Sequence, residues 1–140
     1  MERGPTASLT AGTLYFALAF AAGFVLGTIR VLAVVPAVGE TLAVLIELPI
    51  MLTVSWIACG FVIRRLNVPA TVHHRIVMGA AAFTLLMIAE VGVAWLLGRR
   101  SVSDYLAHYT ALAGALGLAG QVVFATFPLL RLKLAEKVGS

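Results

Sequence analysis

The sequence is short of charge. Only 11% of its 140 residues are Asp, Glu, Lys or Arg, against about 25% in ordinary soluble domains. A soluble domain of this length needs a polar surface, which six acidic and ten basic residues do not provide. A bilayer solvates apolar side chains directly, so this shortage excludes a conventional soluble domain. It predicts a chain that lies almost wholly in a membrane.

The residues that usually carry catalysis or bind cofactors are also scarce. The single cysteine, Cys59, lies in an apolar run and can form neither an internal disulfide nor a metal cluster. The sequence has no phosphate-binding loop, no dinucleotide fingerprint, no HExxH motif and no histidine at the middle of an apolar run. We therefore expect no cofactor, and an enzyme is the less favoured class, with a small lipid-processing enzyme as its remaining form.

Hydrophobic residues make up the other side of this composition. They account for 61% of the sequence, and the mean hydropathy is +1.05. A helix that crosses a bilayer needs about 20 mostly apolar residues. The apolar runs predict a single all-α domain, a bundle of four transmembrane helices over residues 9–29, 41–63, 76–97 and 105–130.

Prolines and glycines suggest where these helices break. Arg30 closes the first run, and Pro36 and Gly39 follow, which predicts an interfacial turn after residue 30. Pro49 lies inside the second run, where the missing amide proton predicts a kink near Leu45.

The basic residues predict the orientation. Lysine and arginine favour the cytoplasmic side of a membrane, and the side with the two termini and the second loop holds more of them. The chain is therefore predicted to have both termini in the cytoplasm. The formal net charge of +4 is interpreted as contact with lipid headgroups, and nucleic acid is not expected as a partner. The bases on the side of the termini are Arg3, Arg64, Arg65, Arg75, Arg131, Lys133 and Lys137, and those on the other side are Arg30, Arg99 and Arg100.

Two acids inside the apolar runs are the most informative residues. An acid at the middle of a bilayer costs about 2.5–3.5 kcal/mol on insertion scales, so Glu47 and Glu90 must face protein or water and find partners there, or be protonated. Counted from the ends of their runs, both lie roughly 10 Å below the outer boundary at 1.5 Å per residue. We therefore expect them at one level of the bundle.

Three other residues complete a candidate site in the outer leaflet. Arg30 at the outer end of the first run can reach down to Glu47 and Glu90, while Glu40 and His108 are placed at the mouth. Such a site binds a proton, a cation or a small polar ligand. The alternative is an ion-pair network that only orients the helices.

The other polar and small residues suit helix packing. Gln121 is placed deep in the fourth run, towards the cytoplasm, as a hydrogen-bonding contact between helices. The adjacent His73 and His74 fall on the cytoplasmic side, far from the acids, so no metal site is expected. Small residues at regular spacing predict close packing of the first and fourth helices, within the chain or in a homo-oligomer: Gly23, Gly27, Gly114, Gly117 and Gly120.

Several segments resemble a group of small four-helix membrane proteins of proteobacteria that has no assigned activity. The resemblance implies a fold and a bacterial source, and with them a location in the bacterial inner (plasma) membrane, but no mechanism. It is carried by Gly27-Thr-Ile-Arg30, Gly39-Glu-Thr-Leu-Ala-Val-Leu-Ile-Glu-Leu-Pro49, Ser55-Trp56, Met78-Gly-Ala-Ala-Ala-Phe83, Ala89-Glu90 and Ala119-Gly-Gln121.

Two functions fit these features. The first is transport or ligand sensing through the polar site. The second is an accessory or structural subunit of a larger membrane complex, for which the near absence of loops leaves only surfaces inside the membrane as contacts. In both cases the lipid bilayer is the immediate partner.

Overall fold

The computed structural model is an all-helical chain, and it describes residues 5–96, 98, 103, 107 and 110–139. None of these residues forms a strand. Four helical stretches are long and apolar enough to cross a bilayer, so the chain is an integral membrane protein. The elements are α1 (Pro5–Ile29), a π-helical turn η1 (Arg30–Val34), α2 (Val35–Val38), α3 (Glu40–Leu66), α4 (Val72–Leu96) and α6 (Leu112–Gly139).

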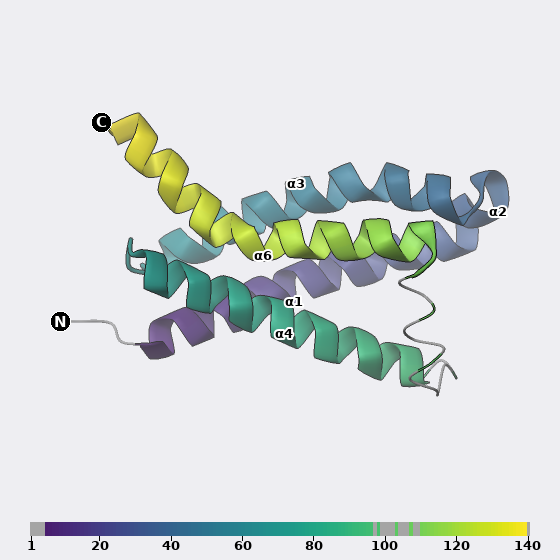
Figure 1. Ribbon diagram of the computed structural model, residues 1–140, viewed down its shortest axis with the longest axis horizontal. Coiled ribbons are helices and arrows are strands. Elements are labelled where there is room, and N and C mark those ends of the chain that lie inside the picture. Colours follow the sequence, from purple (N-terminus) through teal and green to yellow (C-terminus); the bar gives the residue numbers. More distant parts are fainter. Residues whose placement is uncertain (1–4, 97, 99–102, 104–106, 108–109, 140) are drawn as a thin grey trace.

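The four long helices form a bundle in which α1 and α6 each pack against both α3 and α4. Both termini lie at one end of the bundle, beside the turn between α3 and α4, and the turn after α2 lies at the opposite end (Figure 1). We call these the terminal end and the Gly39 end. The four-helix bundle predicted from the sequence is confirmed, whereas the cytoplasmic location of the terminal end stays a prediction.

The first span is longer than predicted. The helix does not stop at Arg30 but continues through η1 and α2 to Val38. Pro36 is tolerated because it stands in the first turn of α2, where its missing amide proton costs little. Just before it the helix widens, and the Val35 amide donates to the Arg30 carbonyl five residues back. The predicted break at Pro36 was therefore wrong.

The chain reverses at Gly39, whose φ of 86° and ψ of 166° suit glycine but strain other residues. Arg30 is consequently nine positions before the turn (39 − 30 = 9), or about 13 Å along the helix at 1.5 Å per residue. It lies within the membrane-spanning part of the helix and not at its end, as the sequence had suggested.

The fourth span also differs from its predicted bounds. The described helix α6 begins at Leu112, and most of residues 105–109 are outside the described part of the chain. The helix runs on past residue 130 and contains Pro128. Figure 1 shows its C-terminal part bending away from the bundle, as expected where proline removes a helical hydrogen bond.

The turn between α3 and α4 follows from its sequence. Asn67 ends α3 in the left-handed conformation, with φ 51° and ψ 51°, which asparagine tolerates better than most residues. The Val68 amide then donates to the Ile63 carbonyl at 3.1 Å. The Thr71 hydroxyl accepts the His74 amide at 3.3 Å and so caps the start of α4.

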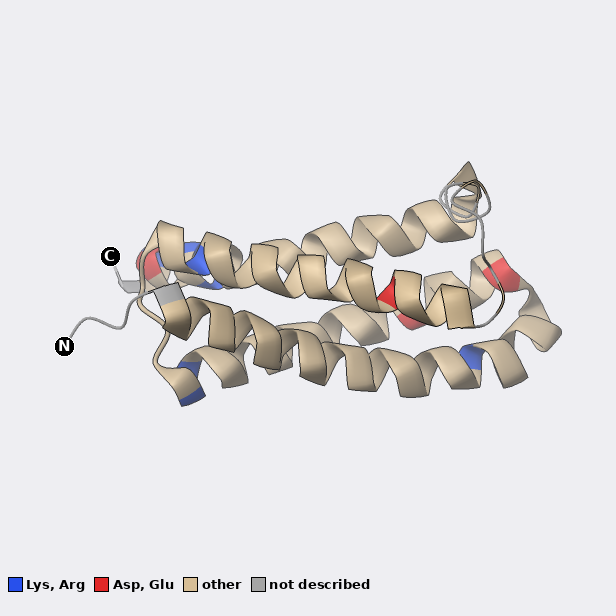
Figure 2. Cartoon of the chain, turned by 90° about the horizontal axis from the view of Figure 1, so that it is seen from below, with Lys and Arg blue, Asp and Glu red and all other residues tan. Residues whose placement is uncertain are grey.

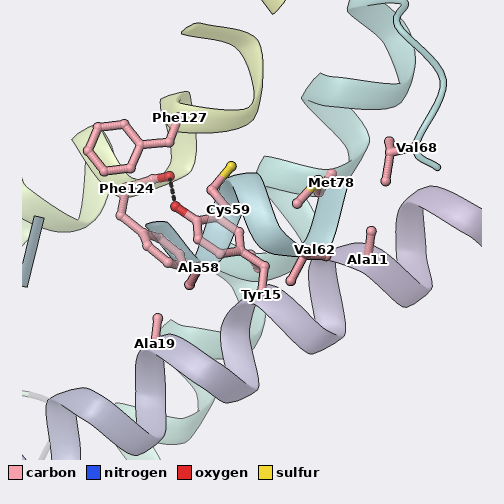
Figure 3. Close-up of a cluster of buried hydrophobic side chains, with 11 residues drawn as sticks. Ala11, Tyr15, Ala19, Ala58, Cys59, Val62, Val68, Met78, Phe124 and Phe127 are labelled. Carbon is pink, nitrogen blue, oxygen red and sulfur yellow. Dashed lines mark hydrogen bonds between the residues drawn. The ribbon is translucent and has the colours of Figure 1, made fainter. Parts of the chain in front are cut away.

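The buried core lies mainly in the terminal half of the bundle (Figure 3). Tyr15 of α1 is fully buried and stacks on Phe124 of α6, with ring centroids 4.2 Å apart. Small and medium-sized side chains from α1, α3 and α4 surround this pair, so all four helices contribute to one cluster. Its other members include Ala11, Ala19, Ala58, Cys59, Val62, Val68, Met78, Ala82 and Phe127.

The close helix contacts follow the predicted glycines only in part. A Cβ at Gly79 of α4 would lie 2.1 Å from the Ala125 carbonyl oxygen of α6, and one at Gly12 would lie 2.7 Å from the Met78 oxygen. Of the predicted set, Gly120 makes a tight contact, at 2.5 Å from Leu48 Cδ1, whereas a Cβ at Gly117 would have nothing within 4 Å. The small residues in the Gly39 half therefore leave space instead of filling an interface.

We expect Gly79→Ala to destabilise the protein by about 1–3 kcal/mol, because the new methyl group collides with the backbone of α6. Gly92→Ala, on the same helix with nothing within 4 Å of the new Cβ, should be neutral or stabilising by up to about 1 kcal/mol through helix propensity. Reversible unfolding in mixed micelles measures both variants. Equal stability of the two variants would contradict the packing.

Candidate functional site

A cavity of about 820 Å³ lies in the bundle, mostly in its Gly39 half, and all four long helices contribute to its lining. The helices diverge towards this end (Figure 1). Small residues open the space, because Ala19, Gly23 and Gly27 of α1 line one wall and Gly114 and Gly117 of α6 line another. The spacing that predicted close packing thus produces a cavity.

The lining is polar as well as apolar. Figure 2 shows that most acidic positions lie towards the Gly39 end and most basic positions towards the terminal end. Three acids, Glu40, Glu47 and Glu90, line the cavity together with Arg30 and Gln121. The structure therefore places four of the five predicted site residues at one cavity. His108, the fifth, lies outside the described residues.

Arg30 and Glu47 form an ion pair between Arg30 Nε and Glu47 Oε2. The turn at Gly39 explains how they meet, because Arg30 stands nine positions before it and Glu47 eight positions after it (47 − 39 = 8). The two arms of the hairpin bring these side chains to one level. Their side chains are 27% and 18% exposed, so the pair is shielded but not sealed.

Glu90 has a different partner from the one predicted. Its Oε1 accepts a hydrogen bond from Gln121 Nε2, which links α4 to α6. The prediction of Gln121 as a polar contact between helices agrees with this bond, but its predicted depth was wrong. Because α6 begins at Leu112, Gln121 is nine residues from the Gly39 end of its helix (121 − 112 = 9), close to the level of Glu90.

Arg30, Glu47 and Glu90 therefore do not form one triad. Instead the cavity has two acid–donor pairs, Arg30 with Glu47 between α1 and α3 and Glu90 with Gln121 between α4 and α6. Glu40 is exposed in the first turn of α3, where an acid also suits the helix dipole.

Phe124 lines the inner end of the cavity, and behind it lies a contact that the sequence did not reveal. The Tyr15 hydroxyl donates to the Phe124 carbonyl at 2.7 Å, drawn as the dashed line in Figure 3. Four residues after Phe124 stands Pro128, which has no amide proton, so this carbonyl lacks its usual helical donor. A tyrosine deep in an apolar run and a proline in another were the available signals.

Two arginines that the sequence assigned to loop and tail also bond to carbonyls at the terminal end. Arg75 is 6% exposed, and its Nη1 donates to the Pro128 carbonyl at 3.1 Å. Arg131 Nη2 donates to the Trp56 carbonyl at 2.7 Å, and its Cζ lies 4.2 Å from the centre of the Trp56 ring. These bonds tie α4 to α6 and α6 to α3.

The fold and cavity define a class, a four-helix integral membrane protein whose cavity is lined by apolar surface and by a few charged and polar side chains. Comparison with known protein families, with characterised proteins and with solved structures finds no match to this chain. The resemblance to small proteobacterial membrane proteins therefore stays a hypothesis, and the cavity itself carries the functional argument.

Removing one partner of the Arg30–Glu47 pair should cost more than removing both. Glu47→Leu leaves a shielded guanidinium without its acid, so we expect a loss of about 2 kcal/mol in unfolding free energy. Arg30→Met with Glu47→Leu should recover most of it. A double-mutant cycle measures the coupling.

The control for this cycle is Lys133–Glu136, whose side chains are both 58% exposed and whose charged atoms lie 3.9 Å apart. Its coupling should be below about 0.5 kcal/mol. Additive losses at Arg30 and Glu47 would show that the pair is not energetically coupled.

Tyr15→Ala should open the terminal side of the cavity and expose Cys59, which is buried beside Tyr15 (Figure 3). We expect N-ethylmaleimide to label this single cysteine at least tenfold faster than in the original protein, which rapid quenching and mass spectrometry measure. Val25→Ala, on the same helix at a residue that is 58% exposed and does not line the cavity, is the control and should leave the rate unchanged. Unaltered labelling of Tyr15→Ala would mean that Tyr15 does not seal this end.

Proposed function

We propose that this protein binds a small polar or charged ligand in the cavity of its Gly39 half, as a step in transport or ligand sensing. The observation that carries the proposal is an open space of about 820 Å³ within the bundle, with Glu47, Glu90, Arg30 and Gln121 on its walls. Small-molecule sites usually measure about 300–1,000 Å³, so the cavity is of the right size.

The polar pairs alone do not require such a space. A network that only orients helices is satisfied by close packing, and this chain packs closely around Tyr15 and Phe124 in its terminal half. In the Gly39 half, by contrast, nothing lies within 4 Å of the point where a Cβ at Gly117 would stand, so the space between the helices is not filled by side chains. Apolar contact between subunits does not need the charged and polar side chains that line this space, and their presence favours ligand binding.

The cavity has unequal ends. Phe124, with Tyr15 bonded behind it, lines the terminal side, whereas Glu40 and Arg30 line the cavity near the Gly39 end. With the predicted orientation, the ligand enters from the outer leaflet or the outer aqueous phase. Transport then requires that the contact of Tyr15 with α6 open, and Pro128, which interrupts the helical hydrogen bonds four residues further on, provides the hinge.

Gly117→Leu tests the proposal because a side chain at this position enters the cavity without a clash at its Cβ. Gly92→Leu makes the same change on α4, where the glycine is exposed, has open space around it and does not line the cavity. The original protein and the two variants are purified in parallel from membranes of the same expression host. The compounds that each protein releases on denaturation are then compared by mass spectrometry.

We expect a compound that accompanies the original protein and Gly92→Leu and is reduced at least tenfold in Gly117→Leu. The unfolding temperatures of the variants show that both remain folded. If all three proteins release the same compounds in the same amounts, the cavity does not retain a ligand and the proposal fails.

A further inference from the structure

We propose that the ligand is a protonated amine with an apolar body, and that its ammonium group hydrogen-bonds to Gln121 and Glu90. This inference rests on the proposed function and names the chemical class that the cavity recognises. Three features support it: the balance of charge on the walls, a buried acceptor, and the apolar surfaces around them.

The charge of the described lining favours a cation. Glu40, Glu47 and Glu90 line the cavity against one described base, Arg30, which already pairs with Glu47. An anionic ligand would enter against these carboxylates in a region of low dielectric constant, where like charges repel strongly. A cation instead gains from both acid-bearing walls.

The amide of Gln121 supplies the more specific signal. Its Nε2 donates to Glu90, which turns its Oε1 away as an acceptor. This oxygen is buried, and among the described residues it accepts no hydrogen bond. A buried acceptor left unsatisfied costs about 1–3 kcal/mol. A ligand with an N–H group satisfies Gln121 Oε1 and places its positive charge beside Glu90.

The remaining lining fits the body of the ligand. Phe20 and Phe24 of α1, Leu48 and Leu52 of α3 and Leu86 of α4 present apolar surface to the same space. The cavity is much larger than an ammonium group, so most of it has to be filled by carbon. Aromatic rings near the site also attract cations through their faces.

A set of four naphthalene compounds separates charge from hydrogen bonding. It consists of 1-naphthylmethylamine, its N,N,N-trimethyl derivative, the alcohol 1-naphthalenemethanol and the carboxylate 1-naphthaleneacetate. Binding is measured calorimetrically at neutral pH with the protein in phosphatidylcholine nanodiscs, and empty nanodiscs correct for partition into lipid. The zwitterionic lipid keeps the membrane from sorting the compounds by charge.

We expect the primary amine to bind at least tenfold more tightly than the alcohol, and the carboxylate to bind least. The trimethyl compound keeps the charge but has no N–H group, so it should bind at least threefold more weakly than the primary amine. Gln121→Met should abolish that threefold preference, and Glu90→Gln should weaken amine binding at least tenfold. Gly117→Leu should abolish binding, and the matched Gly92→Leu should preserve it.

The results distinguish failure of the amine assignment from failure of the proposed function. If Gly117→Leu abolishes binding but the alcohol or the carboxylate binds as tightly as the amine, the cavity is a ligand site and the amine assignment is wrong. Equal binding of the primary and trimethyl compounds overturns the role of Gln121. Amine binding that Gly117→Leu leaves unchanged, or no binding of any compound, overturns the inference. The proposed function is then decided by the co-purified compounds.

Discussion

Hydrocarbon offers no hydrogen bonds, and this constraint determines how the terminal half of the bundle is assembled. Pro128 cannot donate to the Phe124 carbonyl, and the Tyr15 hydroxyl of another helix does so instead. The carbonyl of Pro128 itself accepts from Arg75 of α4. Arg131 in the next turn of α6 reaches the Trp56 carbonyl of α3. Bonds around one irregular segment of α6 therefore connect all four helices, and the buried core lies where they meet.

The Gly39 half meets the same constraint differently. Its polar groups are side chains, and Glu47 and Glu90 each have a donor on a neighbouring helix, Arg30 for Glu47 and Gln121 for Glu90. These pairs hold the helices in two couples, α1 with α3 and α4 with α6, and small residues keep the space between them open. Pairing at the walls satisfies the charges and leaves the cavity available.

Composition and spacing were sufficient to predict the helices, because a bilayer allows few alternatives to long apolar spans. Composition and spacing were less reliable where the same residue type is compatible with two different local structures. Pro36 breaks a helix interior but is tolerated in a first turn, and the π-helical widening that puts it there has no clear signal in the sequence. This error misplaced Arg30. Likewise Gly117 has the sequence spacing of a packing glycine. Whether a neighbouring helix comes close to it depends on how far the helices diverge, and at Gly117 none does. The partner of Glu90 depended on where α6 begins.

The closure of the cavity and the irregularity of α6 have one origin. Tyr15 bonds to Phe124 because Pro128 leaves that carbonyl without a helical donor, and the same proline allows the helix to bend. Any motion of α6 at Pro128 therefore acts on the residue that seals the terminal side. The Arg75 bond to the Pro128 carbonyl opposes such a motion by holding the bend against α4. Donors from two other helices, Tyr15 of α1 and Arg75 of α4, bond to the carbonyls of Phe124 and Pro128. The packing at the terminal side of the cavity therefore depends on bonds at one irregular segment of α6.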